Sequence, residues 1–185
     1  MYRILKSLKD TYITNRIISN KFRATDANVG HGGTLDLFKL HDENVLTGTS
    51  EPQELSRLLI KFDLSPLQKL TGSNLDIDHS SFTCTLKLYD VYGGQPCPTN
   101  FSVIVHPLSK SFDEGTGTDV KMYSHLDSCN FITASVANTS PTLWNTQGAN
   151  ASGILGQSNI DIIASGNLND GNGVVNLYKT QSFST

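Results

Sequence analysis

The sequence predicts an all-β protein, an antiparallel β-sandwich or jelly roll with long loops and one or two short helical turns. Short stretches in which apolar and polar residues alternate recur along the chain, which is the period of a half-buried strand. Charged residues make up only 17% and hydrophobic residues 37% of the 185 residues, and the turn-forming Ser, Thr, Asn and Gly supply much of the remainder. We therefore expect many short strands in a single domain that spans residues 1–185.

The first half of the chain carries four strand patterns and one helical pattern. Alternation predicts strands over Arg3–Leu8, Thr11–Ile13 and Thr34–Leu40. The segment Arg57–Leu64 is more continuously apolar, so we expect a central strand that is covered on at least one face. The segment Ser65–Leu70 predicts one helical turn, with its serine as the cap and its proline at the first helical position.

The rest of the chain continues the β pattern less regularly. Phe82–Tyr89 and Phe101–Val105 both alternate, and we expect them to be neighbouring strands on either side of a loop rich in Gly and Pro. Ile160–Ala164 and Val174–Tyr178 are predicted strands separated by a turn rich in Asn and Gly. A short helix is predicted around His125–Asn130.

Patterns for nucleotide and metal binding are weak. Gly30–Gly33 is rich in glycine but precedes a strand, whereas a phosphate-binding loop must open a helix, so we interpret it as an ordinary loop. The five histidines lack the spacing that sets two imidazoles on one face. Oxygen-bearing side chains crowd Asn167–Asn172, but Tyr178 stands where a calcium-binding loop needs glutamate, so a turn that bonds its own backbone is favoured. We expect no cofactor and no metal.

Patterns for catalysis are weak as well. The chain has no Gly-x-Ser-x-Gly sequence, and its cysteines lack a catalytic signature. Asp113 and Glu114 are the visible carboxylate pair, but adjacent residues on a strand point to opposite faces. Trp144, with Tyr89 and Tyr92, is the candidate platform for stacking a sugar, although a single tryptophan more often belongs to the core. We expect the protein not to be an enzyme.

Charge and hydropathy restrict the partners. The net charge is −3 and the Lys and Arg residues are scattered, which argues against a nucleic-acid partner. No run approaches the roughly 20 apolar residues of a membrane span, so we expect no membrane partner. The start at Met1–Lys6 has charge and no apolar signal segment, so we expect synthesis and folding in a cytoplasm. Reduced thiols are expected at Cys84, Cys97 and Cys129.

The middle of the chain resembles a known family. Arg57–Ser65, followed by a polar connection and Cys84–Tyr89, is similar to the DNRLRE-type β-sandwich family, in which an Arg-led strand ends in Phe-Asp-Leu-Ser and a second apolar strand follows. Asp10–Ile13 resembles its opening strand, and Asn28–Gly30 with Thr34-Leu35 resembles its Asn-x-Gly loop and second strand. Phe112–Gly115 is similar to its Trp-x-Glu-Gly motif, and Thr142–Asn145 is similar to its Thr-x-Trp-Asn motif. The resemblance implies a β-sandwich without catalytic activity.

The chain also departs from that family. Phe112 replaces the usual tryptophan, and the closing strands that follow an Asp-Val-Thr segment are not found. We expect these terminal strands to come from a neighbouring subunit or from a missing C-terminal part. A second resemblance covers Leu8–Ser19, Ala27–Leu40 and Asp90–Pro96, which are similar to uncharacterised structural proteins of marine tailed bacteriophages.

The two resemblances imply a non-enzymatic virion structural protein, an assembly or decoration module of tail, neck, baseplate or capsid. It would be made in the host cytoplasm and would contact other virion proteins as several copies in a symmetric assembly. The alternative is a carbohydrate-binding module of a host-recognition appendage, with a host-surface glycan as ligand. The expected contact loops are Gly93–Pro98 and Ser135–Ser152. The candidate interaction residues are Tyr92, Gly93, Gly94, Gln95, Pro96, Trp144 and Asn145.

Overall fold

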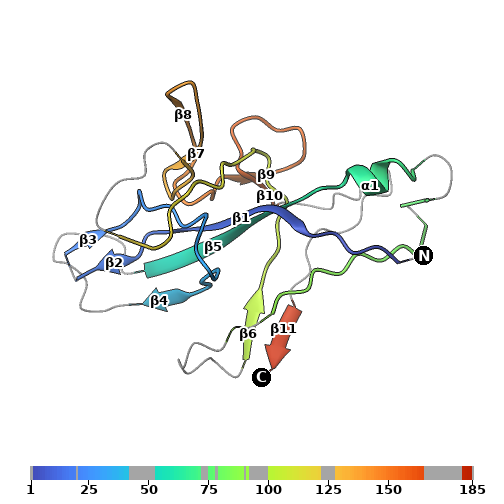
Figure 1. Cartoon of the computed structure of the whole chain (residues 1–185), viewed down its shortest axis with the longest axis horizontal. Coiled ribbons are helices and arrows are strands. Elements are labelled where there is room, and N and C mark those ends of the chain that lie inside the picture. The colour runs from blue at the N-terminus through green and yellow to red at the C-terminus, as the bar shows by residue number, and fades with distance from the viewer. Residues whose placement is uncertain are drawn as a thin grey trace.

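The protein is all-β, as its sequence predicts. The computed structural model describes residues 2–19, 21–41, 53–71, 75–77, 79–89, 91, 100–121, 128–164 and 181–184. These residues form eleven strands and one four-residue helix, arranged as one three-stranded sheet and four two-stranded sheets (Figure 1). These small sheets do not by themselves define two stacked layers, so the β-sandwich and jelly-roll topologies stay predictions.

The three-stranded sheet has the order β1–β5–β4. Strand β1 spans Ser7–Thr14, β4 spans Lys39–His41 and β5 spans Gln53–Phe62. Strand β5 pairs antiparallel with both neighbours, which confirms the central strand predicted from its apolar sequence. The two strands predicted at 3–8 and 11–13 are one strand that begins at Ser7, because Ser7 lies opposite Phe62, the last residue of β5.

The predicted strand at 34–40 is largely wrong, because hydrogen bonds to the Ser56 side chain replace most of the expected backbone pairing with β5. The Ser56 hydroxyl on β5 donates a hydrogen bond of 2.6 Å to the Asp36 carbonyl oxygen and accepts one of 2.9 Å from the Phe38 amide. Only Lys39–His41 pairs with β5 as a strand. The alternating pattern therefore identified the segment that lies along β5 but not the way in which it is held.

The strand predicted at 101–105 is confirmed over residues 101–103, but its predicted neighbour at 82–89 is not a strand. Strand β6, Asn100–Val103, pairs antiparallel with β11, Gln181–Ser184. Residues 82–89 form no strand, and residues 83–89 are exposed, so their alternating pattern has no buried face in this structure. Alternation specifies which side chains share a face but carries no information about the partner strand.

The predicted helical turn is present as α1, Ser65–Gln68, but its cap differs from the prediction. Leu64 occupies the cap position and makes no side-chain cap hydrogen bond. The carboxylate of Asp63 instead accepts a hydrogen bond of 3.0 Å from the Ser65 amide. Pro66 lies in the first turn, as expected. The helix predicted around 125–130 is not found over 128–130, and its remaining residues lie outside the described part of the chain.

The second half contains a hairpin that the sequence analysis missed. Strands β7, Thr133–Ala137, and β8, Ser140–Leu143, pair antiparallel across a two-residue turn. Both turn residues have positive φ, 50° at Asn138 and 67° at Thr139, which is the conformation of a type I′ turn. Most of the hairpin lies in the segment 135–152 that was predicted to be a loop, so the loop assignment is wrong for 135–137 and 140–143, and the contact role stays a prediction.

Two further short pairs complete the described strands. Strands β2, Ile17–Ile18, and β3, Phe22–Arg23, form an antiparallel pair that was not predicted. The strand predicted at 160–164 is confirmed only as β10, Ile162–Ile163, which pairs in parallel with β9, Ser152–Gly153. The strand predicted at 174–178 and the turn before it lie outside the described residues.

The core lies between the three-stranded sheet and the chain that follows residue 112. One cluster of buried side chains joins them: Ile13, Leu59, Phe112, Cys129, Phe131, Ala134, Trp144 and Ala149. Ile13 comes from β1 and Leu59 from the central strand, whereas the other six belong to loops and to β7. Figure 1 shows β7 to β10 on one side of β1 and β5. The loops of this side are therefore packed against the sheet.

Candidate functional site

The residues predicted to interact with partners are not brought together by the described structure. Tyr92, Gly93, Gly94, Gln95 and Pro96 lie outside the described residues. Two further candidates, at the end of the β7–β8 hairpin, can be placed.

Trp144 is a core residue and not a stacking platform. It is only 5% exposed, and its indole nitrogen donates a hydrogen bond of 2.9 Å to the Asn130 carbonyl oxygen. The prediction of an exposed contact at Trp144 is therefore wrong, and the alternative of a core tryptophan is confirmed. Asn145 is exposed, and its backbone amide donates to the carboxylate of Asp161 at 2.7 Å.

The adjacent carboxylates Asp113 and Glu114 each bind a different strand. Asp113 accepts a hydrogen bond of 2.7 Å from the Val136 amide on β7. Glu114 accepts one of 2.9 Å from the Asp10 amide on β1. Both carboxylates are acceptors for backbone groups of the protein itself, and they diverge as expected from their positions. Their role in this geometry is to attach the loop at 112–115 to both sides of the fold.

Asn28 is a loop residue whose side chain forms four hydrogen bonds. It is fully buried, and its amide nitrogen donates to the carbonyl oxygens of Glu114 at 2.8 Å and of Cys129 at 2.7 Å. Its side-chain oxygen accepts from the amides of Gly30 at 3.2 Å and of Gly117 at 2.8 Å. All four hydrogen-bonding positions of a carboxamide are thus used. Asn28 joins three loops that are distant in the sequence.

The glycines around Asn28 permit this close approach. A Cβ atom at Gly30 would overlap the carbonyl oxygen of Glu114, and one at Gly117 would overlap that of Asn28. Gly115 has φ of 78°, a conformation that L side chains rarely adopt. The Asn-x-Gly and Phe-x-Glu-Gly segments, which carry part of the family resemblance, are therefore in direct contact.

Asp161 organises a second loop from a fully buried position. Its carboxylate accepts hydrogen bonds from the amides of Asn145 at 2.7 Å and of Thr146 and Ala151, each at 3.0 Å. The ammonium group of Lys110 lies 3.4 Å from one carboxylate oxygen. Burial alone would raise the pKa of Asp161, but the three amides and Lys110 outweigh it and hold the pKa below its usual value. The carboxylate is therefore ionised and structural.

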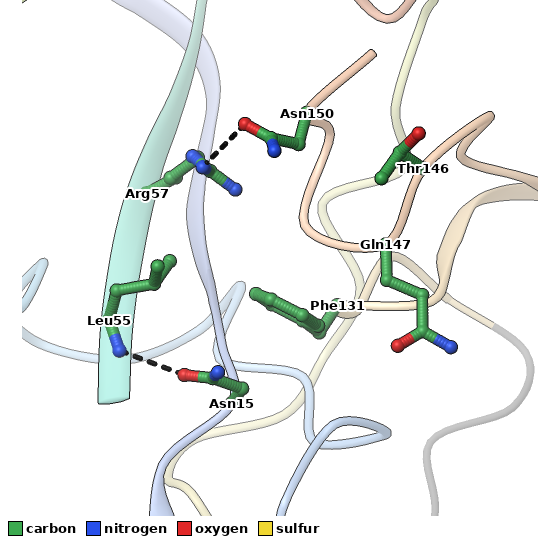
Figure 2. Close-up of a pocket in the computed structure, with 7 residues that line it drawn as sticks. All are labelled: Asn15, Leu55, Arg57, Phe131, Thr146, Gln147 and Asn150. Atoms are coloured by element: carbon green, nitrogen blue, oxygen red, sulfur yellow. Dashed lines mark hydrogen bonds between the residues drawn. The ribbon is translucent and has the colours of Figure 1, made fainter. Parts of the chain in front are cut away.

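A polar cavity of about 340 Å³ lies where β1 and β5 meet the loop at 146–150 (Figure 2). Leu55 and Phe131 contribute its apolar surface, and Arg57 projects from β5 toward the loop. The remaining lining residues carry amide or hydroxyl groups: Asn15, Thr146, Gln147 and Asn150. The cavity thus combines one cation, several neutral polar groups and an aromatic ring.

Arg57 is partly buried there without a carboxylate. Its guanidinium donates to the carbonyl oxygen of Gly148 and, at 2.8 Å, to the side-chain oxygen of Asn150, both of which are neutral. Burial lowers the pKa of Arg57. Burial and then the positive charge of Arg57 lower the pKa of the neighbouring His106. Among the described residues, no carboxylate lies within ion-pair distance of Arg57.

A second unusual surface is the segment formed by residues 82–89 and Val91. It contains large apolar side chains that are exposed, with relative exposures of 39% at Leu86 and Leu88, 84% at Tyr89 and 67% at Val91. No hydrogen bond joins the backbone of residues 83–89 to another described residue. We name this stretch the exposed segment. Toward the described residues, its apolar content and its lack of backbone pairing are those of an unpaired strand.

Cysteine reactivity provides a direct check of these placements. Cys84 lies in the exposed segment and is exposed, whereas Cys129 is fully buried in the core. Burial, followed by the charge of Asp113, raises the pKa of the Cys129 thiol, so little reactive thiolate forms there. We expect iodoacetamide to alkylate Cys84 in the native protein and Cys129 only after denaturation, as measured by peptide mass spectrometry. Rapid alkylation of native Cys129 would contradict the described core.

Metal and membrane features are not found in the described part of the chain. Within it, no group of three His, Cys, Asp or Glu side chains is arranged to hold a metal ion. The calcium candidate at 167–172 lies outside that part. None of the helices in the described residues has the length and apolar character needed to cross a bilayer.

Comparison with known proteins gives no relative. No family model, no curated protein and no solved structure matches this chain.

Proposed function

We propose that the chain is a non-enzymatic structural protein of a bacteriophage particle, an assembly or decoration module that acts through protein–protein contacts. The observation that carries this proposal is the exposed segment, whose apolar side chains are exposed and whose backbone at 83–89 forms no hydrogen bond with another described residue. Exposed apolar stretches of this kind commonly mark protein–protein interfaces. An extended strand from a neighbouring subunit would pair with the backbone and cover alternate side chains, including Leu86 and Leu88.

The placement of the polar residues supports the same function. Asp113, Glu114 and Asp161, the residue types that acid–base chemistry uses, bind backbone amides of the protein itself. The side chain of Asn28 likewise directs its hydrogen bonds to backbone groups of loops. The resemblance to phage structural proteins agrees with a module that functions through contacts at its surface and not through a reactive centre. Repetition of such a contact in a symmetric particle multiplies a modest affinity.

Mass spectrometry of purified particles of the encoding phage tests the proposal. We expect the chain to be present in many copies, and its absence from particles would exclude a virion role. Alkylation then locates the contact. Cys84 should lose its reactivity in intact particles and regain it after dissociation, whereas Cys129 should be protected in both states.

A pair of substitutions separates a contact defect from a folding defect. The double change Leu86→Asp and Leu88→Asp should reduce incorporation into particles at least about tenfold, because charges cannot be buried at an apolar interface. The matched control is Leu155→Asp, since Leu155 is 64% exposed and lies outside the exposed segment. The control should incorporate normally, and equal incorporation of the double variant would exclude the exposed segment as the contact.

A further inference from the structure

We propose that the cavity beside Arg57 binds a carboxylated sugar, that is, one hexuronate unit of an acidic polysaccharide. This site is separate from the exposed segment, so it does not rest on the assembly role. The proposal stands on three features of the cavity: a guanidinium with unused donors, a lining of neutral polar side chains, and a volume that suits a small ligand.

The guanidinium supplies the recognition of charge. A guanidinium has five N–H donors, and Arg57 uses two of them, toward Gly148 and Asn150. Both acceptors are neutral, so the positive charge has no counter-ion among the described residues. Three N–H donors therefore remain, and a carboxylate has two coplanar oxygens that can accept from a pair of guanidinium donors. Binding an anion would therefore restore the charge balance that burial of Arg57 disturbs.

The lining supplies the recognition of hydroxyl groups. Thr146, Gln147 and Asn150 are exposed at the cavity and carry both donors and acceptors, which are the groups that sugar hydroxyls require. The ring of Phe131 adds an apolar wall. At about 340 Å³ the cavity falls at the lower end of the roughly 300–1,000 Å³ typical of ligand pockets. An acidic protein side chain would satisfy Arg57 alone and leave the amides of the lining without a partner.

The backbone holds this arrangement in place. Gly148 has φ of 78°, and a Cβ atom there would lie 2.6 Å from both the Arg57 guanidinium and the Phe131 ring. The loop therefore passes close to both groups because it has glycine at this position. Asn15 on the far side fixes the strand by accepting a hydrogen bond of 2.8 Å from the Leu55 amide (Figure 2). The cavity is thus formed before a ligand arrives.

Titration of the full chain with sugars, followed by NMR, tests the site. D-glucuronate and D-galacturonate should shift the side-chain signals of Arg57, Gln147 and Asn150 with dissociation constants on the order of millimolar, as expected for a single sugar unit. D-glucose should bind at least about tenfold more weakly, because it lacks the carboxylate. Acetate should also bind more weakly, because it lacks the hydroxyl groups.

Substitutions identify the residues responsible. Arg57→Lys should weaken uronate binding at least about tenfold, because lysine cannot form the bidentate contact. Gln147→Ala, a change at an exposed residue, should weaken it a few-fold without loss of fold. Lys61→Met is the matched control: it removes an exposed cation from the same strand, and Lys61 does not line the cavity. Its affinity for uronate should be unchanged.

A readout in the unmodified protein keeps the test decisive if Arg57→Lys fails to fold. A bound carboxylate would offset the positive charge of Arg57, so the pKa of His106 should rise when uronate binds. No shift of His106 and of the lining residues at tens of millimolar uronate would overturn the proposal. Equal binding of glucose would overturn the role of the carboxylate, and equal binding of acetate would overturn the assignment to a sugar.

Discussion

Replacement of Asn28 by alanine is expected to lower the free energy of unfolding by about 4 kcal/mol, because it leaves several buried backbone groups without a partner. The carbonyl oxygens of Glu114 and Cys129 and the amides of Gly30 and Gly117 would all lose their hydrogen bonds. For a chain of 185 residues, this corresponds to a fall of roughly 10 °C in Tm. Calorimetry or thermal denaturation followed by circular dichroism measures it.

Two further variants define the cause. Asn28→Asp keeps the size of the side chain but cannot donate to the two carbonyl oxygens, so it should be as destabilising as alanine. Asn145→Ala is the control, because Asn145 is exposed and contributes only its backbone amide to the Asp161 network. The control should stay within about 0.5 kcal/mol of the parent protein. A loss of less than about 1 kcal/mol for Asn28→Ala would show that the three loops are not joined through this side chain.

The second large effect is expected at Asp161. Asp161→Asn should cost about 3 kcal/mol at neutral pH, because the amide group of asparagine cannot accept from Thr146 and Ala151 and carries no charge for Lys110. Lys110→Met removes only the partly exposed member of the pair and should cost about 1 kcal/mol. Asp119→Asn is the matched control, since Asp119 is exposed and, within the described residues, accepts a hydrogen bond from the neighbouring Val120 amide.

The contribution of Asp161 also depends on pH, and its direction follows from the sign of the pKa shift. The pKa of Asp161 is lowered in the folded protein, so the unfolded chain takes up a proton first as the pH falls. The stabilisation is complete well above the ordinary pKa of about 3.9 and is lost as the pH falls through the folded pKa. Urea denaturation at a series of pH values should therefore show the parent and Asp161→Asn converging in acid. A constant difference between them would contradict this linkage.

Local patterns in the sequence were sufficient for part of the fold. The apolar run at 57–64 predicted the central strand, since only a strand covered on its faces stabilises so many apolar residues. Pro66 and its neighbours predicted the helical turn. Both predictions depend on the residues themselves and on no distant partner. The β7–β8 hairpin was missed, although Asn138 before a short alternating run is a residue that tolerates the positive φ of its turn.

The candidate site was much less accessible to sequence reasoning. Trp144 was chosen as a candidate contact because an aromatic ring can stack on a sugar, but its side chain is buried in the core. Arg57 was noted only as the first residue of a strand. Its cavity is formed by the strand together with the loop at 146–150, about ninety residues later in the chain, and no local pattern signals that contact.

By itself, the sequence determined the all-β class, the central strand and the absence of a recognisable catalytic pattern, because these depend on residue type and local period. The tertiary structure alone decided which polar residues are structural: it buried Asn28 and Asp161 among backbone groups and left Arg57 beside a cavity. It also decided that the alternating segment at 82–89 forms no strand with the described residues. The physical reason is that hydrogen-bond partners and strand pairings are contacts between residues far apart in the chain, which a local pattern does not specify.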